Sequence, residues 1–391
     1  MNPFIYDIGT KVYFGKEELC HLGEEIKKYG NNLFMIYTGK NIIEDNGLYS
    51  LVYEESKKYG FNVVEFSKVT PNPRHSDVQE GIDLCREKGC DVILAIGGGS
   101  TMDSAKAISS GFYINAPIWD VVKGKYKVTK SLPIITIPTI SATGSEMNIG
   151  AVISNLDTNE KLSLRYPTQR PKASFLNPYY AMTVGKYQTA CGTIDILCHT
   201  IETYFNDDEG MFMLDTFMEG LVSTVLKYGT IAYNEPTNYE ARANLMWAAP
   251  WAINDFIRND KSKTWTMHPI EHEISAFYDI THGLGLAILM PRYLRHIIDE
   301  KSLPRFRRLA VKSFGLDGSL SDKELALGVI KQIEDFAFNK LELESKLSNL
   351  GIDDTHFEEM ASRLANDNGY FTAGYRKLSK DEIVDILKEC L

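Results

Sequence analysis

Four side chains in the second half of the chain have the types and spacing of a divalent-metal site. Asp195 and His199 are four residues apart in an apolar segment, and His268 and His282 follow. Residues i and i+4 share one face of a helix, so a carboxylate oxygen and an imidazole nitrogen could reach the same ion. Three imidazoles and one carboxylate leave a coordination position for a substrate oxygen. This set therefore indicates a catalytic rather than a structural metal.

A second group of residues is typical of phosphate binding. Gly97, Gly98, Gly99 and Ser100 follow an expected strand and precede an expected helix. Glycines let the backbone approach a phosphate, and a helix N-terminus offers free N–H groups and the positive end of a dipole. The motif is neither G-x-G-x-x-G nor a Walker loop, so an ordinary tight turn is the alternative. A metal together with a phosphate-bearing cofactor predicts redox chemistry on an oxygenated small molecule.

A loop rich in hydroxyl groups follows a later strand. Thr139, Thr143 and Ser145 all lie within residues 138–147. Such hydroxyls could bind a phosphate, a ribose or the amide of a nicotinamide. A loop whose hydroxyls only cap local backbone groups is the alternative.

The segment 37–41 closes the first expected strand, where the adenine ribose lies in a doubly wound nucleotide fold. An acidic residue there would favour NAD, and the segment has none. Gly39 leaves space, and Lys40 and Asn41 could meet a 2′-phosphate. The segment therefore predicts a preference for NADP(H) over NAD(H), with a solvated loop lysine as the alternative.

One motif in the second half favours a different enzyme class. His268, Glu271 and His272 form the H-x-x-E-H pattern of inverzincin metallopeptidases, in which the two histidines bind zinc and the glutamate is the base. This assignment leaves the other metal candidates and the glycine turn unexplained, so we treat it as the minor alternative.

Composition excludes several partners. The chain has 391 residues, a length that predicts two or three domains, and 44% hydrophobic and 24% charged residues, as in ordinary globular proteins. A net charge of −10 without a basic cluster argues against nucleic acid or an anionic membrane. We see no signal peptide and no apolar stretch of about 18 residues. Six scattered cysteines predict reduced thiols in the cytoplasm.

The first half alternates apolar runs with helical segments, which predicts a mostly parallel sheet covered on both faces. Strands are expected at 33–38, 61–66, 91–96 and 132–137, with helices at 42–59, 76–88 and 102–110 and a β-hairpin made by 151–154 and 161–165. Ser76 is the expected N-cap of the second helix.

Strand patterns fade after about residue 185, near Pro167, Pro171 and Pro178. Helices are expected at 186–206, 211–228, 238–256, 272–278, 282–299, 303–313, 321–339 and 379–391, and Ser379 begins the last with a capping-box pattern. The chain is therefore expected to form an α/β dinucleotide-binding domain, residues 1–185, and an all-α metal-binding domain, residues 186–391.

Taken together, these segments resemble the iron-containing (group III) alcohol dehydrogenases, and within them the NADPH-dependent butanol dehydrogenase branch. The resemblance runs nearly from end to end. It is carried by Thr70–Pro73, Ile96–Asp103, Ile140–Asn148, Asp195–His199 with Glu202, His268–Gly283, Gly285–Ala287 and Pro291.

The resemblance implies a dehydroquinate synthase-like fold and specific site residues. Asp195, His199, His268 and His282 would bind Fe²⁺ or Zn²⁺, and His272 would be a non-ligand histidine on a proton path. The cofactor loops would include Gly98, Gly99, Ser100, Asp103, Thr139, Thr143 and Ser145, with Lys161 near the cofactor. Members of this branch are often dimers, so a homodimer is expected. The segment 37–41 departs from the branch, which commonly has more glycines and a serine there.

The expected activity is the interconversion of primary alcohols and aldehydes, such as butanol and butanal, by hydride transfer with the metal polarising the substrate oxygen. The alternative within the same fold is a lyase like dehydroquinate synthase, which uses NAD and zinc without net redox change. That lyase needs a basic pocket for an acidic substrate, and the helices of the expected site carry few lysines or arginines.

Overall fold

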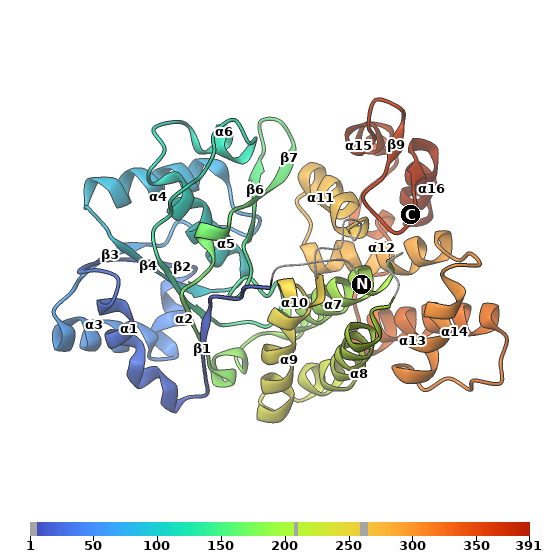
Figure 1. Cartoon of the computed structure of the whole chain (residues 1–391), viewed down its shortest axis with the longest axis horizontal. Helices are drawn as coiled ribbons and strands as arrows, with labels where there is room; N and C mark the ends of the chain where they lie inside the picture. The colour runs from blue at the N-terminus through green and yellow to red at the C-terminus, as the bar shows by residue number, and fades with distance from the viewer. Residues whose placement is uncertain (1–5, 207–209, 259–264) are drawn as a thin grey trace. The chain divides into compact units, whose positions relative to one another are not determined.

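A computed structural model describes residues 6–206, 210–258 and 265–391, and all structural statements below concern these residues. The chain divides into two compact units (Figure 1). One unit is Asp7–Val184 and the other takes in Gly185–Leu391. Each unit is described by itself.

The first unit is built on a six-stranded parallel sheet in the order β1-β8-β5-β4-β2-β3. Its strands are β1 (Lys11–Phe14), β2 (Asn32–Tyr37), β3 (Asn62–Phe66), β4 (Val92–Gly97), β5 (Ile134–Pro138) and β8 (Ala173–Leu176). Every residue of β4 and β5 is buried, as expected for strands covered on both faces. The predicted parallel sheet is confirmed, but β1 and β8, of four residues each, were not predicted.

Helices cover both faces of this sheet (Figure 1). On one face, α4 (His75–Glu87), α5 (Gly99–Gly111) and α6 (Ile118–Val122) pack on Phe34, Ile93 and Ala95. On the other, α1 (Leu22–Lys27), α2 (Lys40–Asp45) and α3 (Leu48–Tyr59) pack on Met35, Leu94 and Ile96. Successive strand residues thus point to opposite faces, and each face has its own apolar core.

Two predictions in this unit were wrong in detail. The helix expected at 42–59 is two helices, because Gly47 between them has a φ of +76°, which a continuous helix cannot contain. Ser76 is not an N-cap: α4 begins one residue earlier, and the extended Arg74 precedes it. The predicted hairpin is confirmed, since β6 (Gly150–Asn155) and β7 (Glu160–Arg165) pair antiparallel.

The second unit is mainly helical. Its helices are α7 (Lys186–Tyr204), α8 (Phe212–Asn234), α9 (Tyr239–Trp251), α10 (Asp255–Arg258), α11 (Met267–Tyr278), α12 (His282–His296), α13 (Leu303–Lys312), α14 (Asp322–Glu334), α15 (Phe357–Leu364) and α16 (Lys380–Glu389). Residues 189–204 of α7 are all buried, so this helix lies inside the unit. The capping box at Ser379 is confirmed.

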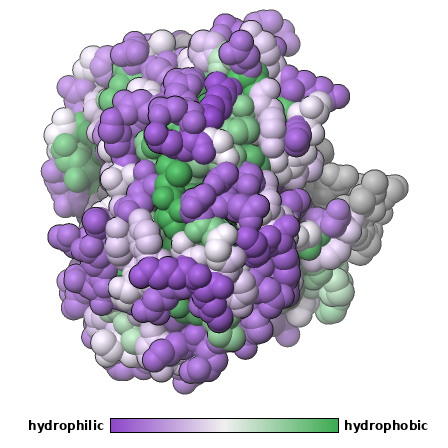
Figure 2. All heavy atoms as spheres, turned by 90° about the vertical axis from the view of Figure 1, so that its left-hand side faces the viewer, coloured by the Kyte–Doolittle hydropathy of each residue, from purple (hydrophilic) through white to green (hydrophobic). Residues whose placement is uncertain are grey.

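Three features of the second unit were not predicted. Helix α11 begins five residues before the expected start. No helix was expected at α15. Two short antiparallel strands of two residues each, β9 (Tyr370–Phe371) and β10 (Leu378–Ser379), form a hairpin. Among the described residues, no helix is long and apolar enough to cross a membrane. The face of the first unit seen in Figure 2 is mostly hydrophilic, with narrow apolar strips.

Candidate metal centre and nucleotide-binding turns

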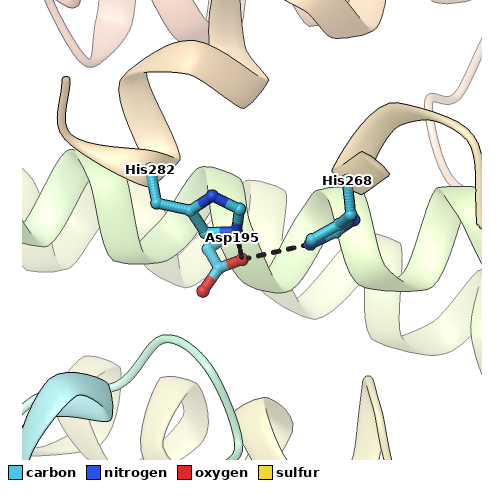
Figure 3. Close-up of side chains that lie close together, drawn as sticks. All are labelled: Asp195, His268 and His282. Atoms are coloured by element: carbon cyan, nitrogen blue, oxygen red, sulfur yellow. Dashed lines mark ion pairs between the residues drawn. The ribbon is translucent and has the colours of Figure 1, made fainter. Parts of the chain in front are cut away.

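Three helices of the second unit bring donor atoms of three of the predicted metal ligands, Asp195, His268 and His282, within 4.8 Å of one another. The fourth, His199, lies beside Asp195. Asp195 and His199 lie one turn apart on α7, while His268 and His282 lie in the first turns of α11 and α12. Figure 3 shows His268 and His282 on either side of the Asp195 carboxylate. The Oδ1 atom of Asp195 is 3.6 Å from His199 Nδ1, 3.6 Å from His268 Nε2 and 3.7 Å from His282 Nε2.

These distances fit donor atoms that share one ion. They are too long for hydrogen bonds, but ligands bonded to a zinc-like ion at about 2.0–2.2 Å are themselves held more than about 3 Å apart. Asp195 Oδ1 and His268 Nε2 are buried and have no hydrogen-bond partner among the described residues. Leaving such atoms unpaired is costly unless something else binds them. The residues present therefore fit a divalent cation.

Electrostatics keep the central carboxylate charged. Burial alone would raise the pKa of Asp195, but the imidazoles of His199, His268 and His282 outweigh burial and lower that pKa well below its usual value. The charged form is the one that binds a metal ion.

Two of the histidines are hydrogen-bonded through Nδ1 to buried glutamates. Glu202 Oε2 is hydrogen-bonded to His268 Nδ1, and Glu271 Oε2 is hydrogen-bonded to His282 Nδ1. With Nδ1 donating to a carboxylate, the Nε2 lone pair of each ring faces Asp195 Oδ1. His199 is held differently: its ring stacks on His268, with centroids 4.5 Å apart, and contacts Trp265 edge-on.

Glu202 has a further role at the start of α11. Its Oε1 atom accepts the backbone N–H groups of Thr266, Met267 and His268. The side chain of Thr266, the N-cap residue, makes no capping bond. A side chain of α7 therefore caps α11 and orients its histidine at once.

His272 lies beside the ligands without completing their set. It is half-buried on α11, and its ring centroid is 5.5 Å from that of His282 and 6.4 Å from that of His268. The peptidase alternative needs Glu271 as a base that substrate can reach. Glu271 is 0% exposed, and its two oxygens accept from Ser275 and His282. The geometry does not support that alternative.

In the first unit, the glycine turn packs closely against the hydroxyl-rich loop. A Cβ on Gly99 would lie 2.4 Å from Thr143 Cγ2, and one on Gly98 would lie 2.9 Å from Ile140 Cγ2. Gly97 has a φ of +156°, and its carbonyl accepts from the backbone N–H of Thr139 at 3.0 Å. The structure thus brings two predicted cofactor segments together, and Ser100 opens α5 beside them.

Asp103 and Ser145 belong to a network under this turn. Ser145 Oγ donates to Asp103 Oδ1 at 2.7 Å, and Asp103 Oδ2 accepts from the Val152 N–H at 2.9 Å. Lys106, fully buried on α5, donates to Ser145 Oγ, Asn148 Oδ1 and the Gly150 carbonyl at 2.8–2.9 Å. These contacts fix the hydroxyl-rich loop on α5, so Asp103 and Ser145 hold the loop in place beside the glycine turn.

The remaining predicted cofactor residues lie at the edges of this region. Thr38 Oγ1 is 2.8 Å from Thr101 Oγ1 in the first turn of α5, which joins the segment 38–41 to the glycine turn. Gly39 precedes α2 with a φ of +73°, Lys40 and Asn41 open that helix, and Lys161 lies buried on β7.

No role was predicted from the sequence for several residues that hold these segments in place. Glu202 was named only as part of the resemblance, and its role could have been inferred, because positions 195, 199 and 202 share one helix face. Lys106, three residues after Asp103 on α5, and Glu65, on β3, carry no comparable local signal, since their partners come from distant segments.

Comparison with known proteins agrees with this geometry. A family model of iron-containing alcohol dehydrogenases matches residues 9–178, and a model of the C-terminal part of that family matches residues 189–391. The chain is 44% identical to NADH-dependent butanol dehydrogenase A of Clostridium acetobutylicum, with 100% of both chains covered. It is 30% identical to NADPH-dependent aldehyde reductase YqhD of Escherichia coli, over 93% of each.

Solved structures give the same result. The crystal structure of NADH-dependent butanol dehydrogenase A from Thermotoga maritima superposes with a TM-score of 0.92 at 34% identity, covering 100% of this chain and 99% of that one. The lyase alternative finds no support in these relatives, all of which are named as dehydrogenases or reductases. The first unit has a six-stranded parallel sheet with a glycine turn, the helical unit has an Asp-His-His-His cluster, and the family models match both units. This chain therefore belongs to the iron-containing alcohol dehydrogenase family.

Proposed function

We propose that this chain interconverts primary alcohols and aldehydes, with butanol and butanal as the test pair, using a nicotinamide cofactor and a divalent metal. The observation that carries the proposal is the buried Asp195 oxygen with three imidazole nitrogens 3.6–3.7 Å away. We propose Asp195, His199, His268 and His282 as the metal ligands, and Fe²⁺ or Zn²⁺ as the ion, because the same nitrogen and oxygen donors bind both.

Residues 7–184 form the proposed dinucleotide-binding unit and the helical unit the metal-binding one. When bound, the ion supplies a Lewis acid and the nicotinamide supplies or accepts the hydride. The chain's own groups hold the ion and fix the ring tautomers through Glu202 and Glu271. We assign to His272, beside His282, the transfer of a proton between the substrate oxygen and solvent.

The proposed cofactor site consists of residues on the glycine turn, the hydroxyl loop and the segment after β2. These are Gly39, Lys40, Asn41, Gly97, Gly98, Gly99, Ser100, Asp103, Thr139, Thr143, Ser145 and Lys161. The bare backbone of the glycine turn and the N-terminus of α5 supply the phosphate-binding groups. We assign Asp103 and Ser145 an indirect part, because they bond to each other below the turn.

The preference between the two nicotinamide cofactors needs its own test. The sequence predicts NADP(H), while relatives of both kinds exist: the Clostridium enzyme is named as NADH-dependent and the Escherichia coli enzyme as NADPH-dependent. The preference for NADP(H) therefore stays a prediction drawn from the segment 37–41.

Two further properties are proposed, the first on the family resemblance and the second on the cysteines. One is a homodimer, for which light scattering of the purified protein is the test. The other is a cytoplasmic location, which agrees with six cysteines that form no disulfide.

The test of the proposed function is the oxidation of NADH and of NADPH with butanal, using protein purified without oxygen and loaded with Fe²⁺ or Zn²⁺. We expect metal-dependent turnover with at least one cofactor. Asp195→Ala should remove bound metal and activity together. Stoichiometric metal with full activity in that variant would refute the ligand assignment, and no turnover with either cofactor or metal would refute the proposed activity on butanal.

A further inference from the structure

A carboxylate from the neighbouring strand lies beside the segment expected to meet the adenine ribose. β3 is the edge strand next to β2, and Glu65 is in register with Met35. Tyr37, the last residue of β2, donates its hydroxyl to Glu65 Oε2 at 2.6 Å. Glu65 thus contacts the side chain of Tyr37, the residue directly before the segment 38–41.

Two tyrosines of α3 complete the surroundings of Glu65. Tyr49 and Tyr53 donate their hydroxyls to Glu65 Oε1 at 2.8 and 2.5 Å. Burial alone would raise the pKa of Glu65, but the three hydroxyls and the charge of Lys40 lower it. Glu65 therefore carries a full negative charge at neutral pH.

Lys40 is already engaged by negative and π-electron-rich groups. Its Nζ atom lies 3.7 Å from Glu44 Oε1 and 4.6 Å from the ring centroid of Tyr49, the same ring whose hydroxyl bonds Glu65. Lys40 therefore pairs with one carboxylate, Glu44, and lies over a ring whose hydroxyl is bonded to a second, Glu65. The local balance is negative, although the segment 37–41 itself contains no acidic residue.

The position of this cluster relative to the glycine turn is set by the sheet. β2 and β4 are adjacent, with Tyr37 opposite Ile96, and the Thr38 and Thr101 hydroxyls are 2.8 Å apart. In doubly wound nucleotide folds, the strand next to the glycine strand ends at the adenine ribose. An acidic group there binds the 2′-hydroxyl of NAD, and a basic group accommodates the 2′-phosphate of NADP.

We propose that Glu65, held by Tyr37, Tyr49 and Tyr53, disfavours a 2′-phosphate and makes NADH the preferred cofactor. The inference rests on the proposed function, since it concerns the nucleotide of the same reaction. In this proposal, Glu65 of β3 takes the role of the acidic residue that the segment 37–41 lacks. It also explains how Lys40 can lie at this position without selecting NADPH.

The test compares wild type with Glu65→Gln, which keeps the size of the side chain, removes its charge and replaces one acceptor oxygen with an NH2 donor. Glu54→Gln is the control, because Glu54 is exposed on the same helix α3 that carries the tyrosines. For each protein, kcat/KM for NADH and NADPH with butanal is measured, and the Kd of each reduced cofactor is measured by nucleotide fluorescence. Thermal unfolding checks that the variants are folded.

We expect wild type to prefer NADH, and Glu65→Gln to raise the NADPH-to-NADH ratio about tenfold, the order of effect of one charge at a partly buried site. Glu54→Gln should leave the ratio unchanged. A wild type that prefers NADPH would overturn the inference, as would a folded Glu65→Gln with an unchanged ratio. If no protein turns over butanal, the proposed activity fails, and the ratio of the two Kd values still decides the role of Glu65.

Discussion

The Nδ1 atom of His282 is hydrogen-bonded to Glu271, a carboxylate with no exposed surface. This contact gives a structural role to Glu271, which the sequence alone suggested as the base of a peptidase. The other oxygen of Glu271 accepts from Ser275 on the same helix. Glu271 thus fixes the orientation of a proposed metal ligand and is closed to any substrate.

Glu271→Gln should weaken metal binding by about 10–100-fold, the usual cost of losing a partner that orients a metal-binding histidine. An amide has one acceptor oxygen, so it cannot serve both Ser275 and His282 as the carboxylate does. The dissociation constant of Zn²⁺, measured by competition with a chelator, tests this. Glu273→Gln is the control, because Glu273 lies on the same helix and pairs with Arg363. Equal affinities in the two variants would refute the role of Glu271.

His272→Ala should lower turnover much more than it lowers metal content. His272 is near the ligands, but the donor atom it offers groups with those of Glu271 and His282 rather than with that of Asp195. The proposed loss is that of a general acid–base group, about 10²–10⁴-fold in kcat. Metal content by mass spectrometry and kcat as a function of pH are measured together. A parallel loss of metal and activity would instead make His272 part of the metal site.

Lys106→Met should loosen the hydroxyl loop from α5. The variant removes a buried donor from Ser145, Asn148 and the Gly150 carbonyl. Ser145 keeps its bond to Asp103 and Asn148 Oδ1 keeps the Gly150 N–H, so the expected cost is about 1–3 kcal/mol, that of the carbonyl. We expect a lower free energy of unfolding and a Kd for reduced cofactor raised at least about tenfold. The affinity for Zn²⁺ should not change, because the proposed ligands belong to the other unit. Lys88→Met, at an exposed position, is the control, and an unchanged cofactor Kd in a destabilised Lys106→Met would limit Lys106 to a structural role.

Glu146 should make stability depend on pH. Burial raises its pKa to about 7 from the ordinary value of 4.5. The folded chain therefore keeps a proton that the unfolded chain loses between about pH 4.5 and 7, so the contribution of Glu146 to the free energy of unfolding is present below this window and is lost as pH rises through it. Glu146→Gln has no such loss.

The stability of Glu146→Gln relative to wild type should therefore increase from pH 5 to pH 7.5, by up to about 3 kcal/mol for a shift of this size. Urea unfolding at both pH values measures it. Titrating groups that do not interact with Glu146 cancel in the difference. Lys106, whose pKa is lowered by burial and raised by the charge of Glu146, is the exception. Parallel pH profiles of the two proteins would contradict the raised pKa.

The sequence was most informative where one short segment held the whole signal. The i, i+4 pair of Asp195 and His199, the apolar strand before Gly97 and the capping box at Ser379 could each be read locally. The family resemblance then joined the metal residues to the cofactor loops. Glu202 was within reach of the same helical reasoning and was not given a role.

The remaining features depend on tertiary structure. β1 and β8 are too short to show a periodicity, and they are strands only because they pair with each other and with β5. Glu65 meets Tyr37 at the end of β2 through the order of the strands, and two tyrosines of α3 complete its surroundings. No spacing in the sequence encodes that meeting. Of the two carboxylates in this cluster, Glu44 could be read from its i, i+4 spacing to Lys40, whereas Glu65 could not.

His268 and His282 both lie in the first turns of their helices, whereas Asp195 and His199 lie well inside α7. The first turn of a helix is the part that opens most easily, because its N–H groups lack partners within the helix. Glu202 caps the first turn of α11, whereas the N-cap side chain of α12 makes no capping bond. An ion can therefore be released when the start of α12 frays while the buried core stays closed. Exchange of one metal for another should therefore be much faster than global unfolding, and the metal carried by the protein would follow the supply in its surroundings rather than a choice made during folding.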